Sequence, residues 1–481
     1  MLKRNLVLFL LASFFAAPAA KAEVKLIAIG SLSGNIRDLS SQTSAPLENG
    51  VWGNLLGGIG SGLAYAGCNT FIAIPDRGPN ALSYNSAVSD TASYINRFQT
   101  LKVKLSPSNL GSALPFTLTP YLVDTTLLFS NEPLYYGNGA GLGLGSGVPA
   151  LNTKNKNYFT GRSDNFNPTP TPPQISTYPN NARFDPEGVR VSNNGKDIFI
   201  SDEYGPYLYQ FNRNTGKRIR VFNLPSKFAV SKSSPVGDTE ISDNTSGRVA
   251  NKGIEGLAIT PNGKTLIGIL QSPLLQDGGT NGAYTRIVKI DIETGFTKEY
   301  AYQLDNIGTS AKPKYPTVSE ILAINDREFL VDERDGKGLG DGSQAAFKKI
   351  YHIDLTNAQE VSNITGESNL AGKAVSKTLF LDVVATLTQN GIKAEDIPAK
   401  LEGLAFGADV VINHVVKHTL FISNDNDFIG TIKSDTYHPT GIDNPNKLFV
   451  FAIDTTDIPG FVPQKIKGDD EYRTPKDRGR R

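Results

Sequence analysis

Five segments of the chain share one pattern of apolar and polar positions. Each begins with a small or acidic residue, usually followed by glycine, and continues as a short apolar run that predicts a buried strand. A second apolar run follows a turn and ends, about fifteen residues from the start, in an acidic or polar cluster. A supersecondary unit repeated at long intervals is typical of propellers and other repeat arrays. The five copies begin at Ser61, Glu187, Glu255, Glu320 and Glu402.

Each unit is predicted to be a β-hairpin. In the second copy the apolar runs flank an Asn-Asn-Gly sequence at 193–195, and in the third they flank Pro-Asn-Gly at 261–263. Such sequences favour tight turns between strands. A turn near residue 195 is expected to place Glu187 opposite Glu203 on the second strand.

The same geometry is expected to pair Glu255 with Gln271 in the third copy, and residue 320 with residue 332 in the fourth. Each glutamate then shares one hairpin end with the later polar cluster, away from the turn. If the hairpins supply the innermost strands of radial blades, these ends gather on one face around a central channel. We therefore predict an all-β fold, a β-propeller with five marked hairpin repeats and five or six blades.

The number of blades depends on the stretch between the first two copies. That interval is about twice each of the next two, which suggests an unmarked sixth blade. Residues 130–182 are rich in glycine and proline, however, and could equally form one long loop over the channel mouth. Apolar runs at 24–31 and 447–453 predict strands at the two ends of the domain. Their pairing would close the ring and remove its edges.

The composition agrees with a large, turn-rich β domain. The 481 residues include 47 glycines and 28 prolines, and only 20% are charged. The formal net charge of +1 gives no support for a nucleic-acid partner. The single cysteine, Cys68, excludes an intramolecular disulfide, so core burial must hold the fold, and a bound metal would add its binding free energy.

The first 22 residues are typical of a secretory signal peptide. Lys3 and Arg4 precede an apolar run at 6–17, and Ala-Lys-Ala at 20–22 is a cleavage site of the small-x-small type. An uncleaved anchor is the alternative, but the apolar run is too short to span a bilayer.

These features divide the chain into three parts. Residues 1–22 form the predicted signal peptide, residues 23–464 the propeller domain, and residues 465–481 a charged, disordered tail. The mature protein is expected in the periplasm or outside the cell, with no membrane partner after cleavage. The sequence leaves the oligomeric state open.

Glutamates occupy equivalent positions in four of the hairpins. Converging carboxylates repel one another, and a hard divalent cation would neutralise them. Calcium, which accepts six to eight oxygen ligands in flexible geometry, is the predicted cofactor. The alternative is that each glutamate forms a structural ion pair with an arginine. The candidate metal ligands are Glu187, Asp202, Glu203, Glu255, Glu320, Asp332, Glu333, Glu402 and Asp425.

The same hairpin ends carry basic side chains. Acids beside arginine and lysine suit metal-assisted attack of water on a phosphate ester, because the basic groups bind the phosphoryl oxygens. None of the four histidines lies at the acidic ends of the repeated motifs, which does not favour a zinc site. The candidate catalytic residues are Glu187, Glu203 and Glu255, and the candidate substrate-binding residues are Arg77, Lys252 and Arg334.

Three strings of residues resemble a known family. They are Arg-Phe-Asp-Pro-Glu-Gly-Val at 183–189, Ser-Asp-Glu-Tyr-Gly-Pro-Tyr at 201–207 and Asn-Lys-Gly-Ile-Glu-Gly-Leu-Ala at 251–258. Such strings resemble the "esterase-like activity of phytase" family, secreted bacterial proteins with a phytase-like domain. The similarity extends from about residue 26 to residue 453. The resemblance implies a β-propeller with phosphatase or esterase activity.

This chain departs from a regular ring of acids at two places. Ser61 replaces the glutamate of the first hairpin, and Ile321 replaces the glycine of the fourth.

Three functions remain open at this point. The first is a secreted, calcium-dependent phosphoesterase or esterase acting on a small phosphate or carboxylic ester. The second is a propeller that binds a ligand or partner without catalysis, and the third is a metal-assisted lactone or carboxylic-ester hydrolase.

Overall fold

The computed structural model describes residues 24–139, 141–167 and 176–467. The predicted signal peptide, the Pro-Thr-Pro run at 168–173 and residues 468–481 lie outside the described residues. Residues 465–467, which the sequence placed in the tail, make contacts with the domain. Ile466 is buried in a core cluster, and the backbone nitrogen of Lys467 donates to the carbonyl of Asn193 at 2.9 Å.

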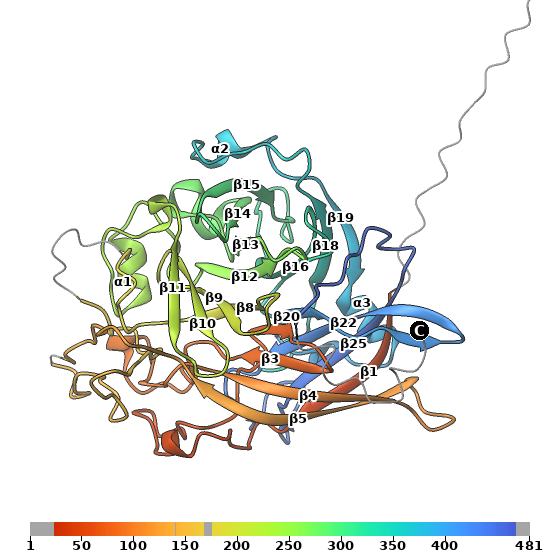
Figure 1. Ribbon diagram of the computed structural model, residues 1–481, viewed down its shortest axis with the longest axis horizontal. Helices are drawn as coiled ribbons and strands as arrows, with labels where there is room; N and C mark the ends of the chain where they lie inside the picture. Colours follow the sequence, from red (N-terminus) through yellow and green to blue (C-terminus); the bar gives the residue numbers. More distant parts are fainter. Residues whose placement is uncertain (1–23, 140, 168–175, 468–481) are drawn as a thin grey trace, which may run out of the picture.

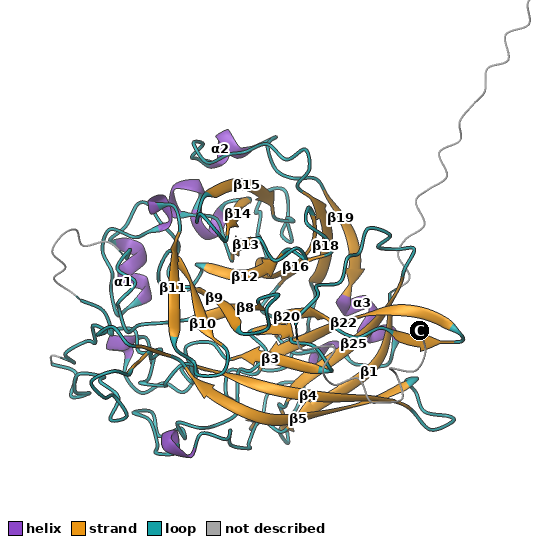
Figure 2. Cartoon of the chain, in the orientation of Figure 1, coloured by secondary structure: helices purple, strands orange, loops and turns teal. Residues whose placement is uncertain are grey.

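Five antiparallel sheets form a ring around a common centre (Figures 1 and 2). From the inner to the outer strand, the first blade contains β2 (Gly62–Tyr65), β3 (Thr70–Ile74), β4 (Arg97–Pro107) and β5 (Phe116–Leu127). In the same order, the second blade contains β8 (Pro186–Val191), β9 (Asp197–Asp202), β10 (Tyr207–Asn212) and β11 (Arg218–Asn223), and the third contains β12 (Ile254–Ile259), β13 (Thr265–Leu270), β14 (Tyr284–Asp291) and β15 (Thr297–Gln303). The fourth contains β16 (Thr317–Ala323), β17 (Glu328–Arg334), β18 (Lys348–Asp354) and β19 (Lys377–Asp382). The fifth contains β20 (Lys400–Phe406), β22 (Val415–Asp425), β25 (Asn446–Asp454) and β1 (Lys25–Leu32), with β21 (Val410–Ile412) beside β22.

Helices are few and short in the described part of the chain. In Figure 2, α1 and α2 lie at the periphery of the ring. No helix among the described residues is long and apolar enough to cross a membrane. The helices are α1 (Gly237–Ser242), α2 (Glu367–Leu370) and α3 (Val383–Gln389), and 3₁₀ turns occur at Ser41–Thr43, Ser86–Val88, Ser226–Phe228, Leu275–Asp277, Gly279–Asn281 and Ala394–Asp396. Two minor ladders join β6 (Phe129–Ser130) to β7 (Asn157–Tyr158) and β23 (Thr431–Ile432) to β24 (Ile442–Asp443).

The N-terminal strand closes the ring, as predicted. Strand β1 pairs antiparallel with β25, from Lys25 opposite Ala452 to Leu32 opposite Asn446. The last blade therefore combines the two ends of the domain. This closure joins distant parts of the sequence and leaves no open gap in the ring.

The ring has five blades and not six. The described residues between β5 and β8 form only the two-residue ladder of β6 and β7. Aromatic residues from this segment pack instead on the second blade, where the Phe159 ring lies 5.5 Å from that of Phe184 and 5.4 Å from that of Tyr209. Without alternating apolar runs the glycine-rich segment cannot build a sheet of its own.

The glycine of the repeated motif is required by close packing between blades. A Cβ atom on Gly188 would lie 2.6 Å from the Cβ of Leu257 in the next blade. A Cβ on Gly256 would lie 2.7 Å from the backbone nitrogen of Ile321, one blade further on. Because the inner strands are buried on both faces, there is no space for the neighbour to retreat.

The inner hairpins carry bulges that change the predicted register. Pro186 pairs with Asp202, the ladder then shifts, and the nitrogen of Glu203 donates to Asp185. Glu187 is therefore not directly opposite Glu203, and a similar shift follows residue 254, so Glu255 is not directly opposite Gln271. The direct pairing of residues 320 and 332 is confirmed. A bulge adds one residue to a strand and turns its side chain in a new direction.

Candidate functional site

The hairpin ends that carry the motif meet around a cavity of about 360 Å³. All five blades contribute side chains to its walls, as expected for the end of a propeller channel. No described residue of the segment 130–182 is among them. The lining residues are Asp76, Arg77, Glu187, Glu203, Asn251, Lys252, Glu255, Gln271, Thr317, Arg334, Gly336, Lys400, Glu402 and Asp425.

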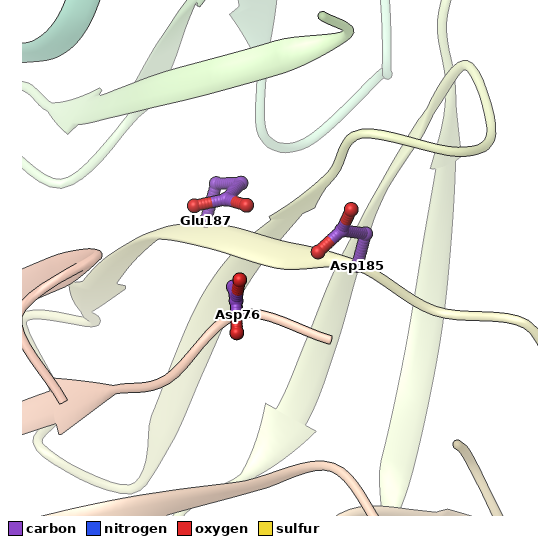
Figure 3. Close-up of side chains that lie close together, drawn as sticks. All are labelled: Asp76, Asp185 and Glu187. Carbon is purple, nitrogen blue, oxygen red and sulfur yellow. The ribbon is translucent and has the colours of Figure 1, made fainter. Parts of the chain in front are cut away.

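Five carboxyl groups form one cluster, and all of them except Asp185 line this cavity. Oxygen atoms of Asp76, Asp185 and Glu187 lie within 4.8 Å of one another, and Figure 3 shows these three side chains around the start of β8. Glu187 also belongs to a second group of the same size with Glu203 and Glu255. We call these five residues the acidic cluster. All five are buried, with no more than 5% of any residue exposed.

Burial and mutual repulsion disfavour the charged forms of these acids. The pKa of Glu187 is raised well above its ordinary value by burial and by the nearby carboxylate of Glu255. Burial and the charge of Glu203 raise the pKa of Glu255 in the same way, and burial with Asp425 raises that of Asp76. As carboxylates, Glu203 and Glu255 each have one buried oxygen without a hydrogen-bond donor in the described structure. A shared proton or a bound cation would satisfy them.

Basic groups complete the walls of the cavity. Nη1 of Arg77 lies 2.7 Å from Oδ2 of Asp185, and the backbone nitrogen of Arg77 donates to the other oxygen of that carboxylate at 2.9 Å. Arg334 pairs with Glu402 in the fifth blade.

Two lysines face the same cavity. Nζ of Lys400 lies 2.9 Å from Oδ2 of Asp425. Nζ of Lys252 donates instead to the amide oxygen of Gln271 at 2.7 Å, and burial lowers the pKa of this lysine. Among the described lining residues, Lys252 is thus the cation whose charge is not already held by an ion pair.

The charges around the cavity do not balance. Three of the basic groups are paired with Asp185, Glu402 and Asp425. Asp76, Glu187, Glu203 and Glu255 then remain, and within the described chain Lys252 is the basic lining residue left to offset them. An all-oxygen donor set with excess negative charge fits a hard divalent cation such as calcium.

Two of the sequence-predicted metal ligands serve structural roles elsewhere. Oε1 of Glu320 accepts hydrogen bonds from the backbone nitrogens of Leu257 and Ile321, and Oε2 lies 3.0 Å from Nη2 of Arg190. This arrangement is the structural ion pair considered above. Glu333 accepts from the hydroxyl of Tyr302 at 2.6 Å and pairs with a lysine. Neither glutamate lines the cavity.

Two further predicted ligands lie behind the cavity wall. Oδ1 of Asp202 accepts from the backbone nitrogens of Asp185 and Tyr204, and so fixes the turn that presents Asp185. Asp332 lies opposite Glu320 in the β16–β17 ladder. Burial raises the pKa of each aspartate to about 8. Of the other predicted residues, the three catalytic candidates, the three substrate-binding candidates, Glu402 and Asp425 all line the cavity.

The site also contains three charged residues that the sequence analysis did not propose, namely Asp76, Asp185 and Lys400. Asp76 closes the first hairpin at the place that Glu203 takes in the second, so it supplies an acid to the blade whose inner strand begins at Ser61. Asp185 belongs to the Asp-Pro-Glu-Gly string itself. Their positions in the repeat could have indicated both, whereas nothing in the pattern singles out Lys400.

The chain is similar to several known proteins. An uncharacterized secreted protein of Arthroderma benhamiae is 26% identical over 393 residues, which cover 72% of this chain and 69% of that protein. One similar solved structure is a periplasmic gluconolactonase from Pseudomonas aeruginosa, with 11% identity and a TM-score of 0.32 over 81% of this chain and 88% of that one. Another is a PQQ-bound aldose sugar dehydrogenase from Streptomyces coelicolor, with 10% identity and a TM-score of 0.33 over 91% of this chain and 100% of that one. At these scores the two structures carry no argument about activity.

A family model gives the more informative match. It covers residues 54–428, a span that includes all five inner hairpins and the whole acidic cluster. The family is described as having the esterase-like activity of phytase. The chain therefore belongs to the phytase-like family.

Proposed function

We propose that this protein is an exported, metal-dependent phosphoesterase that hydrolyses small phosphate esters in the acidic cavity, with calcium as its metal. The observation that carries the proposal is a cluster of five buried carboxyl groups, four of which line a cavity that is also lined by two arginines and two lysines. The family description supports an ester-bond hydrolase as the reaction class. The secreted relative supports export.

The acidic cluster would hold the cation. Glu187 is its central member because it belongs to both groups of close oxygens. The unpartnered oxygens of Glu203 and Glu255 are the other favourable donors, since they lose no existing hydrogen bond on binding. A bound divalent cation lowers the pKa of a coordinated water and neutralises phosphoryl oxygens.

The remaining groups would bind the phosphate and accept a proton from the attacking water. Lys252 can accept an anionic substrate without breaking an ion pair, because its present partner is a neutral amide. Arg77 is held rigidly by Asp185 and presents a fixed guanidinium at the same wall. Burial and the charge of Glu203 raise the pKa of Glu255, so its ionised form would be a stronger base than an exposed glutamate. With a divalent cation held by the acidic cluster, the cation and Lys252 together would favour a doubly charged phosphate ester over a neutral carboxylic ester.

A substrate screen tests the proposal. The chain from Glu23 onward is assayed with p-nitrophenyl phosphate and p-nitrophenyl acetate, each in millimolar calcium and in excess chelator. We expect calcium-dependent release from the phosphate ester. Release from the acetate alone would favour the carboxylic-ester or lactone hydrolase, and release from neither would favour a binding protein.

A matched pair of variants links the activity to the cavity. Glu255→Gln removes one charge from the acidic cluster, and Glu293→Gln removes one from an exposed position in the same blade. The first variant should lose turnover and the second should keep it. Equal turnover in both would contradict the assignment of the site.

A further inference from the structure

One loop near the fifth blade is joined to the rest of the protein through a single imidazole. Residues 433–441 connect β23 to β24, and most of them are exposed. Their backbone hydrogen bonds stay within the loop, where the nitrogens of Asp435 and Gly441 donate to the carbonyl of His438 at 3.2 and 3.0 Å. Within the described chain, the contact between His438 and Asp396 is the only hydrogen bond or ion pair that joins residues 433–441 to a segment outside the β23–β24 hairpin.

The imidazole of His438 bridges two carboxylates from different segments. Its Nε2 lies 2.9 Å from Oδ1 of Asp396, in the 3₁₀ turn Ala394–Asp396 that precedes β20. Its Nδ1 lies 3.1 Å from Oδ1 and 3.2 Å from Oδ2 of Asp435, in its own loop. An ionised carboxylate only accepts hydrogen bonds, so both ring nitrogens must carry a proton for both contacts to be hydrogen bonds. The bridge therefore needs the imidazolium ion.

The groups packed around the bridge favour that protonated form. The hydrogen bond to Asp396, followed by that to Asp435, raises the pKa of His438 above its ordinary value. The cation on the same turn is Lys447 of β25, whose Nζ lies 3.4 Å from the backbone carbonyl oxygen of Asp396. The loop between β17 and β18 presents the neutral Gly342 to Asp435. Its charged neighbour Asp341 accepts a hydrogen bond from Ser343, and its Gln344 donates to Glu395 at 3.1 Å.

Loss of the proton breaks the bridge. A neutral imidazole has one N–H, so whichever nitrogen keeps it, the other turns a lone pair toward an ionised carboxylate. Asp435 stays beside the ring because its Oδ1 also accepts from the backbone nitrogens of Tyr437 at 2.8 Å and His438 at 2.6 Å. Asp396 belongs to a separate segment and has no such tie to the loop. The contact to Asp396 is therefore the one that opens.

We propose that His438 is a pH-sensitive latch: its imidazolium holds the loop 433–441 against the turn that precedes β20, and loss of the proton releases the loop. The latch joins the segment that follows Asp425 to the segment that precedes Lys400, and both of these residues line the acidic cavity. The released loop remains attached through the β23–β24 ladder. This inference does not depend on the proposed phosphoesterase activity.

Hydrogen exchange of the loop amides between pH 5.5 and pH 8.5 tests the latch. Because the pKa of His438 is higher in the latched state, the stabilisation is complete below about pH 6.5 and is lost as the pH rises through the raised value. Exchange rates in the folded chain from Glu23 onward are divided by those of an unstructured peptide at the same pH. The amides of Tyr437, His438 and Gly441 should be about tenfold or more better protected at pH 5.5 than at pH 8.5, on the scale of one hydrogen bond between charged groups. Protection that does not change with pH would overturn the proposal.

Two variants separate the latch from general effects of pH on the fold. His438→Gln removes the titrating group, and Asp396→Ala removes its partner on the other segment. Each should give the loop at pH 5.5 the low protection of the wild type at pH 8.5, while the protection of the inner blade strands stays native. His414→Asn, at an exposed turn position with a φ of 63°, is the matched control and should keep the pH dependence. Wild-type protection at pH 5.5 in either latch variant would show that other contacts hold the loop and would refute the inference.

Discussion

Replacing Glu187 by glutamine should have opposite effects on stability with and without calcium. In the metal-free protein this side chain is buried among carboxylates whose oxygens lie within 4.8 Å. At that separation, two ionised groups repel by about 3.5 kcal/mol in a medium of effective dielectric constant near 20. Protonation avoids the repulsion, but at pH 8 it costs about 5 kcal/mol relative to an exposed glutamate. The metal-free protein therefore loses roughly 3–5 kcal/mol by keeping this group.

Glutamine removes that cost but adds a buried amide. An imperfectly bonded amide takes back about 1–3 kcal/mol, which leaves a net gain of about 2 kcal/mol for Glu187→Gln without metal. For a domain of this size, an unfolding entropy of about 2.1 cal/mol/K per residue converts 1 kcal/mol into about 1 °C. The variant should then melt about 2 °C above the wild type in excess chelator.

Calcium should reverse this order. At a calcium concentration of about one hundred times the dissociation constant, binding stabilises the wild type by about 2.7 kcal/mol, or about 3 °C. The variant, which lacks the central ligand, should gain little. Differential scanning calorimetry of both proteins in chelator and in calcium measures the crossing, with Glu293→Gln as the exposed control. A large loss of stability of Glu187→Gln in chelator would show that the carboxylate is structural and would refute the reasoning.

Two further outcomes follow from the buried acids and the packed glycines. Carboxyl groups with a raised pKa, such as Asp202 and Asp332 at about 8, bind protons more tightly in the folded state. Their contribution to the free energy of unfolding is therefore complete below pH 4 and is lost as the pH rises to about 8. The metal-free protein should consequently have a higher melting temperature at pH 5.5 than at pH 8.5. A melting temperature that does not change with pH would count against the raised pKa values. Gly256→Ala places a Cβ 2.7 Å from the backbone of Ile321 and should cost about 1–3 kcal/mol, whereas Gly237→Ala, with an ordinary contact at 3.6 Å, should leave the melting temperature within about 1 °C. Equal melting of the two alanine variants would show that the blade junction can relax.

The fold could be predicted because its signals are local. An apolar run, a turn and a second apolar run define each inner hairpin, and the structure confirms all five, although β21 is inserted in the connection of the fifth. The closure of the ring by β1 also follows from a general property of propellers. The number of blades could not be fixed in this way, because a long interval without strand signals is compatible with either a weak blade or a loop.

The site was harder to predict because side-chain directions depend on bulges. A turn centred on residue 195 puts Glu187 opposite Glu203, whereas the ladder pairs Val191 with Ile198, one residue out of that register, and then shifts between Pro186 and Val189. Equivalent positions in the repeat also need not share a role. Glu320 resembles Glu255 in sequence but faces Arg190, and only the three-dimensional structure reveals that this arginine crosses the channel.

The central claim is that the acidic cluster holds a divalent cation on which ester hydrolysis depends. Calorimetric titration of calcium into the metal-free mature chain, with p-nitrophenyl phosphate turnover followed over the same calcium range, tests it most directly. We predict one saturable site in the wild type, turnover that rises in step with its occupancy, and loss of both in Glu255→Gln, with turnover reduced about a hundredfold or more. Calcium binding that is unchanged in Glu255→Gln, or turnover that is independent of calcium, would contradict the account.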